Sequence, residues 1–93
     1  MDNQSVAAKI LYSLARRRKW GESHTAYENL FKIFRSESLG KEGMRMANNC
    51  AEDLIRQGLI VKKPTGYGLQ VSLNPNMAQE IKKIIKEELG IEL

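Results

Sequence analysis

The stretch 47–63, ANNCAEDLIRQGLIVKK, passes from a helical pattern to a strand pattern with one glycine between them. Ala47, Ala51 and Leu54 recur at the spacing of one helix face, and Gly58 follows as the residue best suited to a left-handed C-terminal cap. Residues 59–61, Leu-Ile-Val, are apolar and mostly β-branched, as is typical of strands. We therefore predict a helix over about 41–57 that leads directly into a strand.

Two more helices are expected upstream of this junction. Residues 5–19 carry an apolar stripe at helical spacing, and four basic residues crowd the last turn, where cations interact favourably with the helix dipole. The sequence Thr-Ala-Tyr-Glu at 25–28 has the form of a capping box and predicts a second helix to about residue 35. The polar segment 36–40 ends in glycine and is expected to form the turn before the third helix.

A hairpin and a fourth helix are expected downstream. The turn-forming cluster Lys-Pro-Thr-Gly-Tyr-Gly at 63–68 precedes Leu-Gln-Val-Ser-Leu at 69–73, whose alternation predicts a half-buried returning strand. Asn74 and Pro75 mark the start of the last helix, with the asparagine as its cap. The predicted order is helix, helix, helix, strand, strand, helix in a single domain over 1–93. This is an α+β fold that is mainly helical.

The segment 47–61 resembles the second half of a winged helix-turn-helix domain. In that family a recognition helix ends in a Leu-x-x-x-Gly-Leu-Ile pattern, matched here by Leu54 and by residues 58–60, and passes straight into a wing hairpin. The sequence Thr-Gly-Tyr-Gly at 65–68 stands where the tip of the wing would be.

The resemblance covers about 5–73, as a three-helix core with a two-stranded wing. The added helix over 74–93 is similar to that of small prokaryotic or archaeal regulators that dimerise. The resemblance implies sequence-specific binding to double-stranded DNA by a transcriptional regulator, with the third helix in the major groove.

The charge distribution agrees with an anionic partner. The chain has 15 basic and 11 acidic residues, a formal net charge of +4. Twelve of the basic residues but only six of the acidic ones lie within 5–73, whereas 74–93 is close to neutral. This asymmetry indicates a polyanion as partner of the body and a separate role for the tail.

A helical wheel divides the third helix into two faces. With about 100° per residue, the face centred on Ala47 is expected to pack in the core and holds Met44, Cys50, Ala51, Leu54 and Ile55. Arginine and asparagine on the opposite arc are suited to hydrogen bonds with guanine and adenine in the major groove. The expected base contacts are Arg45, Met46, Asn48 and Asn49. On the same arc, Glu52 and Arg56 are expected to form a surface pair.

Contacts with the DNA backbone are expected from side chains around this helix and in the hairpin. Such contacts position a domain without specifying sequence. The residues are Lys32, Arg35, Lys41 and Arg56, with Lys62, Lys63 and Tyr67 in the wing. The alternative for the hairpin is that its charges simply protect an exposed strand edge from pairing with other chains.

The apolar side of the fourth helix needs a partner, and its residues are Ile81, Ile84, Ile85 and Leu89. The helix either folds back on the first helix or pairs with its copy in a second subunit. The apolar residues Ile91 and Leu93 at the end of the chain favour a homodimer. A dimer would place two recognition helices one turn of DNA apart.

Several other classes of function are not indicated. Cys50 is the only cysteine, so neither an internal disulfide nor a cysteine-based zinc site is expected. Nucleotide-binding and hydrolase motifs are absent, and we predict neither an enzyme nor a bound cofactor, metal or small-molecule ligand. Without a signal or membrane-spanning pattern, a cytoplasmic protein with no membrane contact is expected.

Two further functions fit the same pattern. One is a winged helix that binds another protein as a subunit of a larger assembly. The other is an architectural protein that binds DNA or RNA without regard to sequence.

Overall fold

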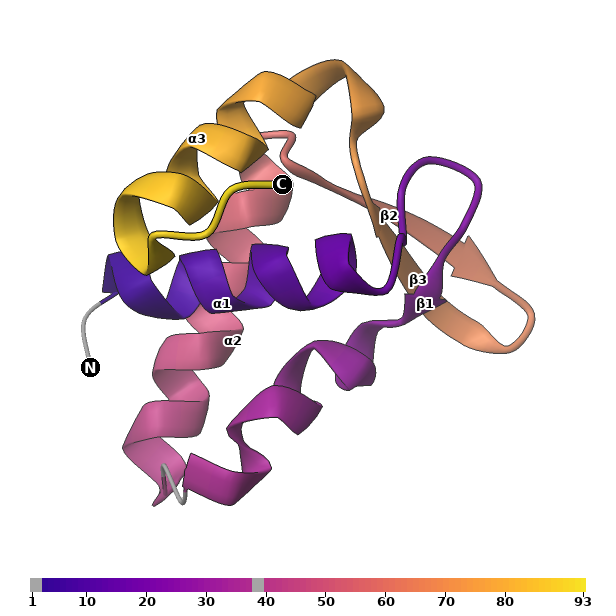
Figure 1. Ribbon diagram of the computed structural model, residues 1–93. Helices are drawn as coiled ribbons and strands as arrows, with labels where there is room; N and C mark the ends of the chain where they lie inside the picture. The colour runs from indigo at the N-terminus through magenta and orange to yellow at the C-terminus, as the bar shows by residue number, and fades with distance from the viewer. Residues whose placement is uncertain (1–2, 38–39) are drawn as a thin grey trace.

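The computed structural model describes residues 3–37 and 40–93, with side chains described for all of these except 35–37. Figure 1 shows a small, mainly helical α+β domain, as predicted. Its elements are α1 (Asn3–Arg16), β1 (Thr25–Ala26), the 3₁₀-helix η1 (Tyr27–Glu37), α2 (Gly40–Arg56), β2 (Ile60–Thr65), β3 (Gly68–Leu73), the 3₁₀-helix η2 (Pro75–Met77) and α3 (Ala78–Leu89).

The first helix ends at Arg16, three residues before the predicted end. Arg18 adopts a left-handed conformation with φ of 58°, which stops the helix. The backbone N–H of Lys19 then donates to the carbonyl of Leu14 at 2.9 Å, so the reversed chain still satisfies one of the free carbonyls of the last turn. The four consecutive basic residues are therefore divided between the helix end and the loop that follows.

The prediction of a second α-helix that begins at Thr25 is wrong in two respects, because the helix begins at Tyr27 and is a 3₁₀-helix. Thr25 and Ala26 form a short strand that pairs antiparallel with Val71 and Gln70 of β3. The hydroxyl of Thr25 accepts a hydrogen bond from the side-chain amide of Asn29 at 2.7 Å and is not a capping-box partner. The residues that follow form η1, so the sheet has three strands in the order β1-β3-β2, where two were expected.

The structure confirms the prediction from residues 47–63 that a helix leads through Gly58 directly into a strand. Gly58 has φ of 80°, the left-handed conformation that a glycine reaches without strain. The N–H of Leu59 returns to the carbonyl of Leu54 at 3.0 Å and closes the helix end. The strand begins one residue later, at Ile60, and pairs with β3 in a hairpin whose two turn residues are Gly66 and Tyr67.

The last helix packs within the same chain. It lies along α1, and Ile81 and Ile85 have no exposed surface. The prediction that these two side chains form a dimer interface is therefore wrong, because a second subunit cannot reach them. Ile84 and Leu89 are half-buried against the same core.

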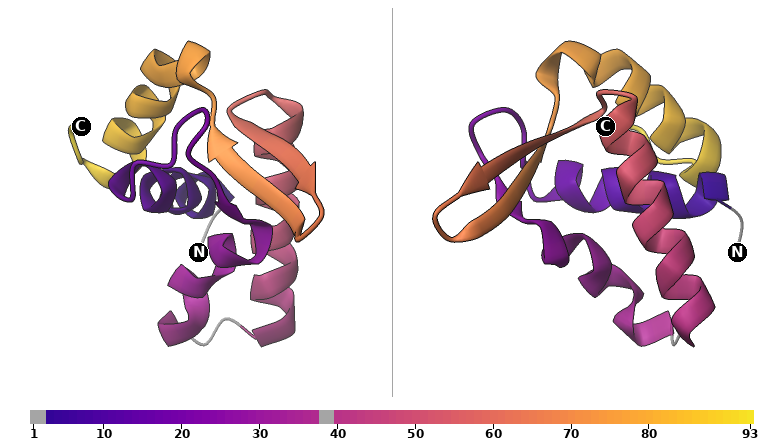
Figure 2. Two further views of the ribbon diagram at one scale, coloured as in Figure 1. Left: turned by 90° about the vertical axis from the view of Figure 1, so that its right-hand side faces the viewer. Right: turned by 180° about the vertical axis from the view of Figure 1, so that it is seen from behind.

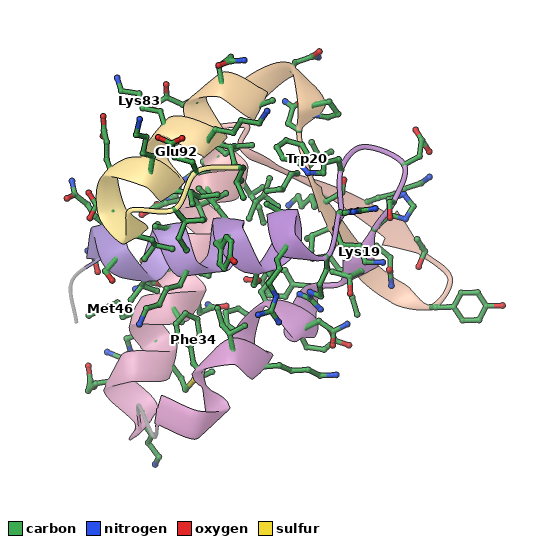
Figure 3. All side chains as sticks on the ribbon, in the orientation of Figure 1. Lys19, Trp20, Phe34, Met46, Lys83 and Glu92 are labelled. Atoms are coloured by element: carbon green, nitrogen blue, oxygen red, sulfur yellow. The ribbon has the colours of Figure 1, made fainter. Side chains whose placement is uncertain are left out.

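The elements lie on two sides of the core. Figure 2 (left) shows α1 and η1 towards one side and α2 with the β2–β3 hairpin towards the other. The largest core side chains come from nearly all elements, and among them are Ile10, Leu14, Leu30, Phe34, Ile60, Leu73 and Ile85. In Figure 3, Phe34 lies between η1 and α2, where it fills the space between these helices. This packing fixes which face of α2 is left exposed.

Candidate nucleic-acid interface

The predicted division of α2 into two faces is confirmed with one exception. Ala47 and Ala51 have 0% exposure, and Cys50 and Leu54 are also buried, so the small side chains let α2 sit close to the core. Met44 was expected on the buried face but is 39% exposed. It lies in the first turns of the helix, where α2 extends beyond the main body of the core (Figure 2).

The opposite face of α2 presents the polar residues predicted to contact bases. Arg45, Asn48 and Asn49 are exposed, whereas Met46 is half-buried and packs against the core. Figure 3 shows Met46 on the flank of α2 that faces the beginning of α1. The outward stripe of α2 therefore includes Arg45, Asn49 and Asp53, and Arg56 follows at the end of the helix.

Tyr27 of η1 holds one flank of this face. Its hydroxyl lies 3.0 Å from Oε1 of Glu52 and 3.0 Å from Oδ1 of Asn48. A phenol has a single hydrogen, and the charged carboxylate of Glu52 is its stronger acceptor. Oδ1 of Asn48 is the alternative acceptor of the same hydrogen. Asn48 is thus already engaged within the chain, whereas Asn49 makes no hydrogen bond to the residues that the structure describes.

The Tyr27 contact also has an electrostatic signature. Burial, with further contributions from the hydrogen bond to Glu52 and from its negative charge, raises the pKa of Tyr27 to about 12. The ring of Tyr27 packs edge-on against Phe31 at 5.4 Å between centroids, which holds the hydroxyl in place. The phenol therefore stays protonated and remains a donor across the physiological range of pH.

Acidic residues of α2 are paired differently from the expectation. Arg56 forms its ion pair with Asp53, one turn away, and not with Glu52. The helix as a whole has three basic and three acidic residues. Because Glu52 and Asp53 have intramolecular partners near the C-terminal end, the net positive part of the exposed face is the N-terminal half, around Lys41 and Arg45.

The hairpin contributes two lysines and a tyrosine. Lys62 pairs with Val71 and Lys63 with Gln70, so the two lysines project from opposite faces of the sheet. Both are exposed, and Tyr67 at the tip is 99% exposed. The hydroxyl of Thr65 fixes the tip by accepting from the N–H of Tyr67 at 3.1 Å and donating to the carbonyl of Gly68 at 2.7 Å.

The remaining predicted backbone contacts are scattered. Lys41 is exposed in the first turn of α2, and Lys32 is exposed on η1, where it lies beside α1 and not beside α2. The side chain of Arg35 lies outside the described residues. The structure therefore brings together the α2 residues and places the hairpin on the same side of the molecule (Figure 2), but it separates Lys32 from them.

Cys50 lies on the buried side of α2. Burial raises the pKa of the Cys50 thiol, and its sulfur lies 3.5 Å from the carbonyl of Asn3, so it is held as a neutral thiol in the core. Among the described residues, no cluster of three or more His, Cys, Asp and Glu side chains is arranged to hold a metal ion. In the same part of the chain, no helix is long and apolar enough to cross a membrane.

Comparison with known proteins gives no relative for this chain. No protein-family model, curated protein or solved structure matches it.

Proposed function

We propose that this chain is a winged helix-turn-helix domain that binds double-stranded DNA in a sequence-specific manner and regulates transcription. In this proposal α2 is the recognition helix in the major groove and the β2–β3 hairpin is the wing. The observation that carries it is the two-faced character of α2. Its alanine side is buried in the core, and on its other side Arg45 and Asn49 are open to solvent and make no hydrogen bond to the described residues.

Each group has a distinct role in the proposed complex. Arg45 donates to guanine and Asn49 pairs with adenine, and both stand in the N-terminal and middle turns that recognition helices use for base edges. Lys41 and the hairpin lysines contact phosphates, which sets the position of the helix. Tyr67 reaches beyond the hairpin to the adjacent groove or backbone. The hydrogen bond between Tyr27 and Glu52 keeps the carboxylate away from the phosphates.

Titration of labelled duplexes over a salt series tests this proposal. Affinity should fall steeply as salt rises, because bound lysines and arginines release counterions from the DNA. The triple variant Arg45→Ala, Asn48→Ala, Asn49→Ala should lose discrimination between the selected duplex and bulk DNA more than it loses total binding. A variant that discriminates as well as the parent would overturn the assignment of α2.

A homodimer remains part of the proposal, with a different contact surface. Ile81 and Ile85 are enclosed, so the exposed apolar group near the end of the chain is Leu93, which lies beside Ala15, Trp20 and Lys82. Two copies in contact there would present two recognition helices to a palindromic site. Sedimentation of the free protein and of its complex with DNA tests this, and a monomer in both states would refute it.

A second candidate is a domain that binds another protein. It is favoured by the equal number of acidic and basic residues on α2 and by the exposed apolar side chains of Val61 and Tyr67 on the hairpin. The same DNA titration separates the two candidates. A protein-binding domain would bind every duplex weakly, even at low salt.

A further inference from the structure

A hollow lies between α1 and η1, apart from the surface described above. Its volume is about 270 Å³, and the residues that matter for its chemistry are Tyr12, Ser13, Arg16, Arg17 and Lys32. The basic residues come from two elements that are far apart in the sequence. Folding therefore gathers cations here that no local sequence pattern places together.

The hollow is strongly cationic. No aspartate or glutamate is found among the described residues that line it, whereas the corresponding hollow beside α2 includes Glu42 and Asp53. Arg17 is held in place because its Nε donates to the carbonyl of Ser13 at 3.1 Å, and this leaves its terminal NH₂ groups available. Arg16 and Lys32 are exposed and make no ion pair with the described residues.

The donors that line the hollow suit a phosphate group. Guanidinium groups bind phosphate through paired, charge-assisted hydrogen bonds, and a lysine adds a further positive charge. Tyr12 also lines the hollow. A phosphodiester of a nucleic-acid backbone presents such a phosphate group from outside.

The hollow lies on the opposite side of the molecule from α2. Ile10, Leu11 and Leu14 of α1 point into the core, so the exposed side of α1 that carries Arg16 faces away from it. Figure 1 shows α1 in front of α2, and the right panel of Figure 2, seen from behind, shows α2 in front of α1. A straight duplex lying on α2 and the hairpin cannot also reach the hollow.

We propose that Arg16, Arg17 and Lys32 form a second phosphate site, which binds the backbone of another nucleic-acid segment. The chain then holds one duplex on α2 and the hairpin and a second duplex at the hollow, and so bridges them. The bridging rests on the proposed function, because it needs α2 to bind the first duplex. The phosphate site at the hollow does not depend on binding by α2.

The test uses two matched double variants of the full chain. Arg16→Gln with Lys32→Gln removes two charges from the hollow and leaves Arg17, which is tied to the helix end, unchanged. Lys82→Gln with Lys83→Gln removes the same charge from exposed positions on α3 (Lys83 is labelled in Figure 3). Thermal unfolding midpoints of both variants that equal the midpoint of the parent show that neither pair of substitutions affects folding.

Bridging is measured as the retention of a labelled duplex on beads that carry a second, immobilised duplex. The parent and the α3 variant should retain the labelled duplex, and the hollow variant should retain about tenfold less. The slope of log affinity for duplex against log salt should also become less steep by about 1 in the hollow variant, because one phosphate contact is lost. Retention and slope equal to those of the α3 variant would overturn the proposal.

Two further variants separate this inference from the proposed function. Each combines the three α2 substitutions with one of the two double substitutions, in the hollow or on α3. If the hollow substitutions still lower its residual, non-specific affinity for duplex, and the α3 substitutions do not, the phosphate site stands even where sequence discrimination by α2 has failed. If neither pair lowers it, the site is refuted.

Discussion

The hydroxyl of Tyr27 donates a hydrogen bond to the carboxylate of Glu52 across 3.0 Å, and this bond ties η1 to the exposed side of α2. Glu52 would otherwise be a negative charge in the middle of the proposed recognition surface. A neutral phenol holds it at the flank, so the outward stripe of α2 consists of Arg45, Asn49 and Asp53, and the last of these is paired with Arg56. One contact between two elements thus supports the fold and shapes the candidate interface.

Replacing Tyr27 by Phe should lower the free energy of unfolding by about 1 kcal/mol, because the pair is partly buried and its acceptor is charged. The effect should depend on pH. Folding raises the pKa of Tyr27 from 10.0 to about 12, so the stabilisation is complete below pH 10 and is lost as the pH rises towards 12. Urea unfolding of the parent and the variant at pH 8, 10 and 12 measures both effects. A difference in stability that stays constant up to pH 12 would refute the linkage.

Tyr67→Phe is the matched control for this experiment. It makes the same chemical change at a side chain that is 99% exposed, and its stability should equal that of the parent at pH 8.

Asn49 should matter more for DNA discrimination than its neighbour Asn48. Both are exposed, but Asn48 is already in contact with Tyr27, whereas Asn49 makes no hydrogen bond to the described residues. Asn49→Ala should reduce discrimination against a wrong base pair by about 1–3 kcal/mol with little change in stability. Asn48→Ala should mainly reduce stability. Competition titrations and urea unfolding of both variants give the comparison, and the reverse pattern would show that Asn48 is the reading residue.

Asn74 should be sensitive even to replacement by Asp. Its Oδ1 accepts from the N–H of Asn76 at 3.0 Å and its Nδ2 donates to the carbonyl of Gly58 at 2.9 Å, so it joins the start of η2 to the end of α2. Asn74→Asp keeps the cap but replaces the donor by a charged acceptor facing a carbonyl. We expect a loss of about 1–2 kcal/mol. If Asp were as stable as Asn in thermal unfolding, the bond to Gly58 would be without effect.

Gly58→Ala should be destabilising by about 1–2 kcal/mol for a purely conformational reason. The residue has φ of 80°, yet an added Cβ would meet no atom within 4 Å, so the loss is not steric crowding. Gly66 also has open space but no left-handed φ, and Gly66→Ala should leave stability unchanged or raise it by less than about 1 kcal/mol. Similar effects of the two substitutions in chemical denaturation would contradict this reading of the α2–β2 junction.

The sequence predicts best the features that are decided locally. Gly58 and the apolar run after it determine where α2 ends, and the alternation in 69–73 determines the returning strand. The strand β1 was missed because its two residues show no alternation, and its partner Val71 lies 46 positions further along the chain. The partner of Glu52 was missed for the same reason, since Tyr27 belongs to another element. A helical wheel shows that Ile81 and Ile85 lie on an apolar face that must pack against another element, but it cannot show whether that element is α1 or a second subunit.

The packing of α3 within its own chain leads to a prediction about concentration. Ile81→Ala removes a fully buried side chain and should lower the free energy of unfolding by about 2–5 kcal/mol, whereas Ile84→Ala, at a half-buried position, should lower it by less. Because Ile81 is covered by its own subunit, the urea midpoint of the Ile81 variant should stay below that of the parent by the same interval over a hundredfold range of protein concentration. If the interval instead grew or shrank with concentration, α3 would draw its stability from contact with a second copy, and the covering of Ile81 by α1 would not be the interaction that holds the helix.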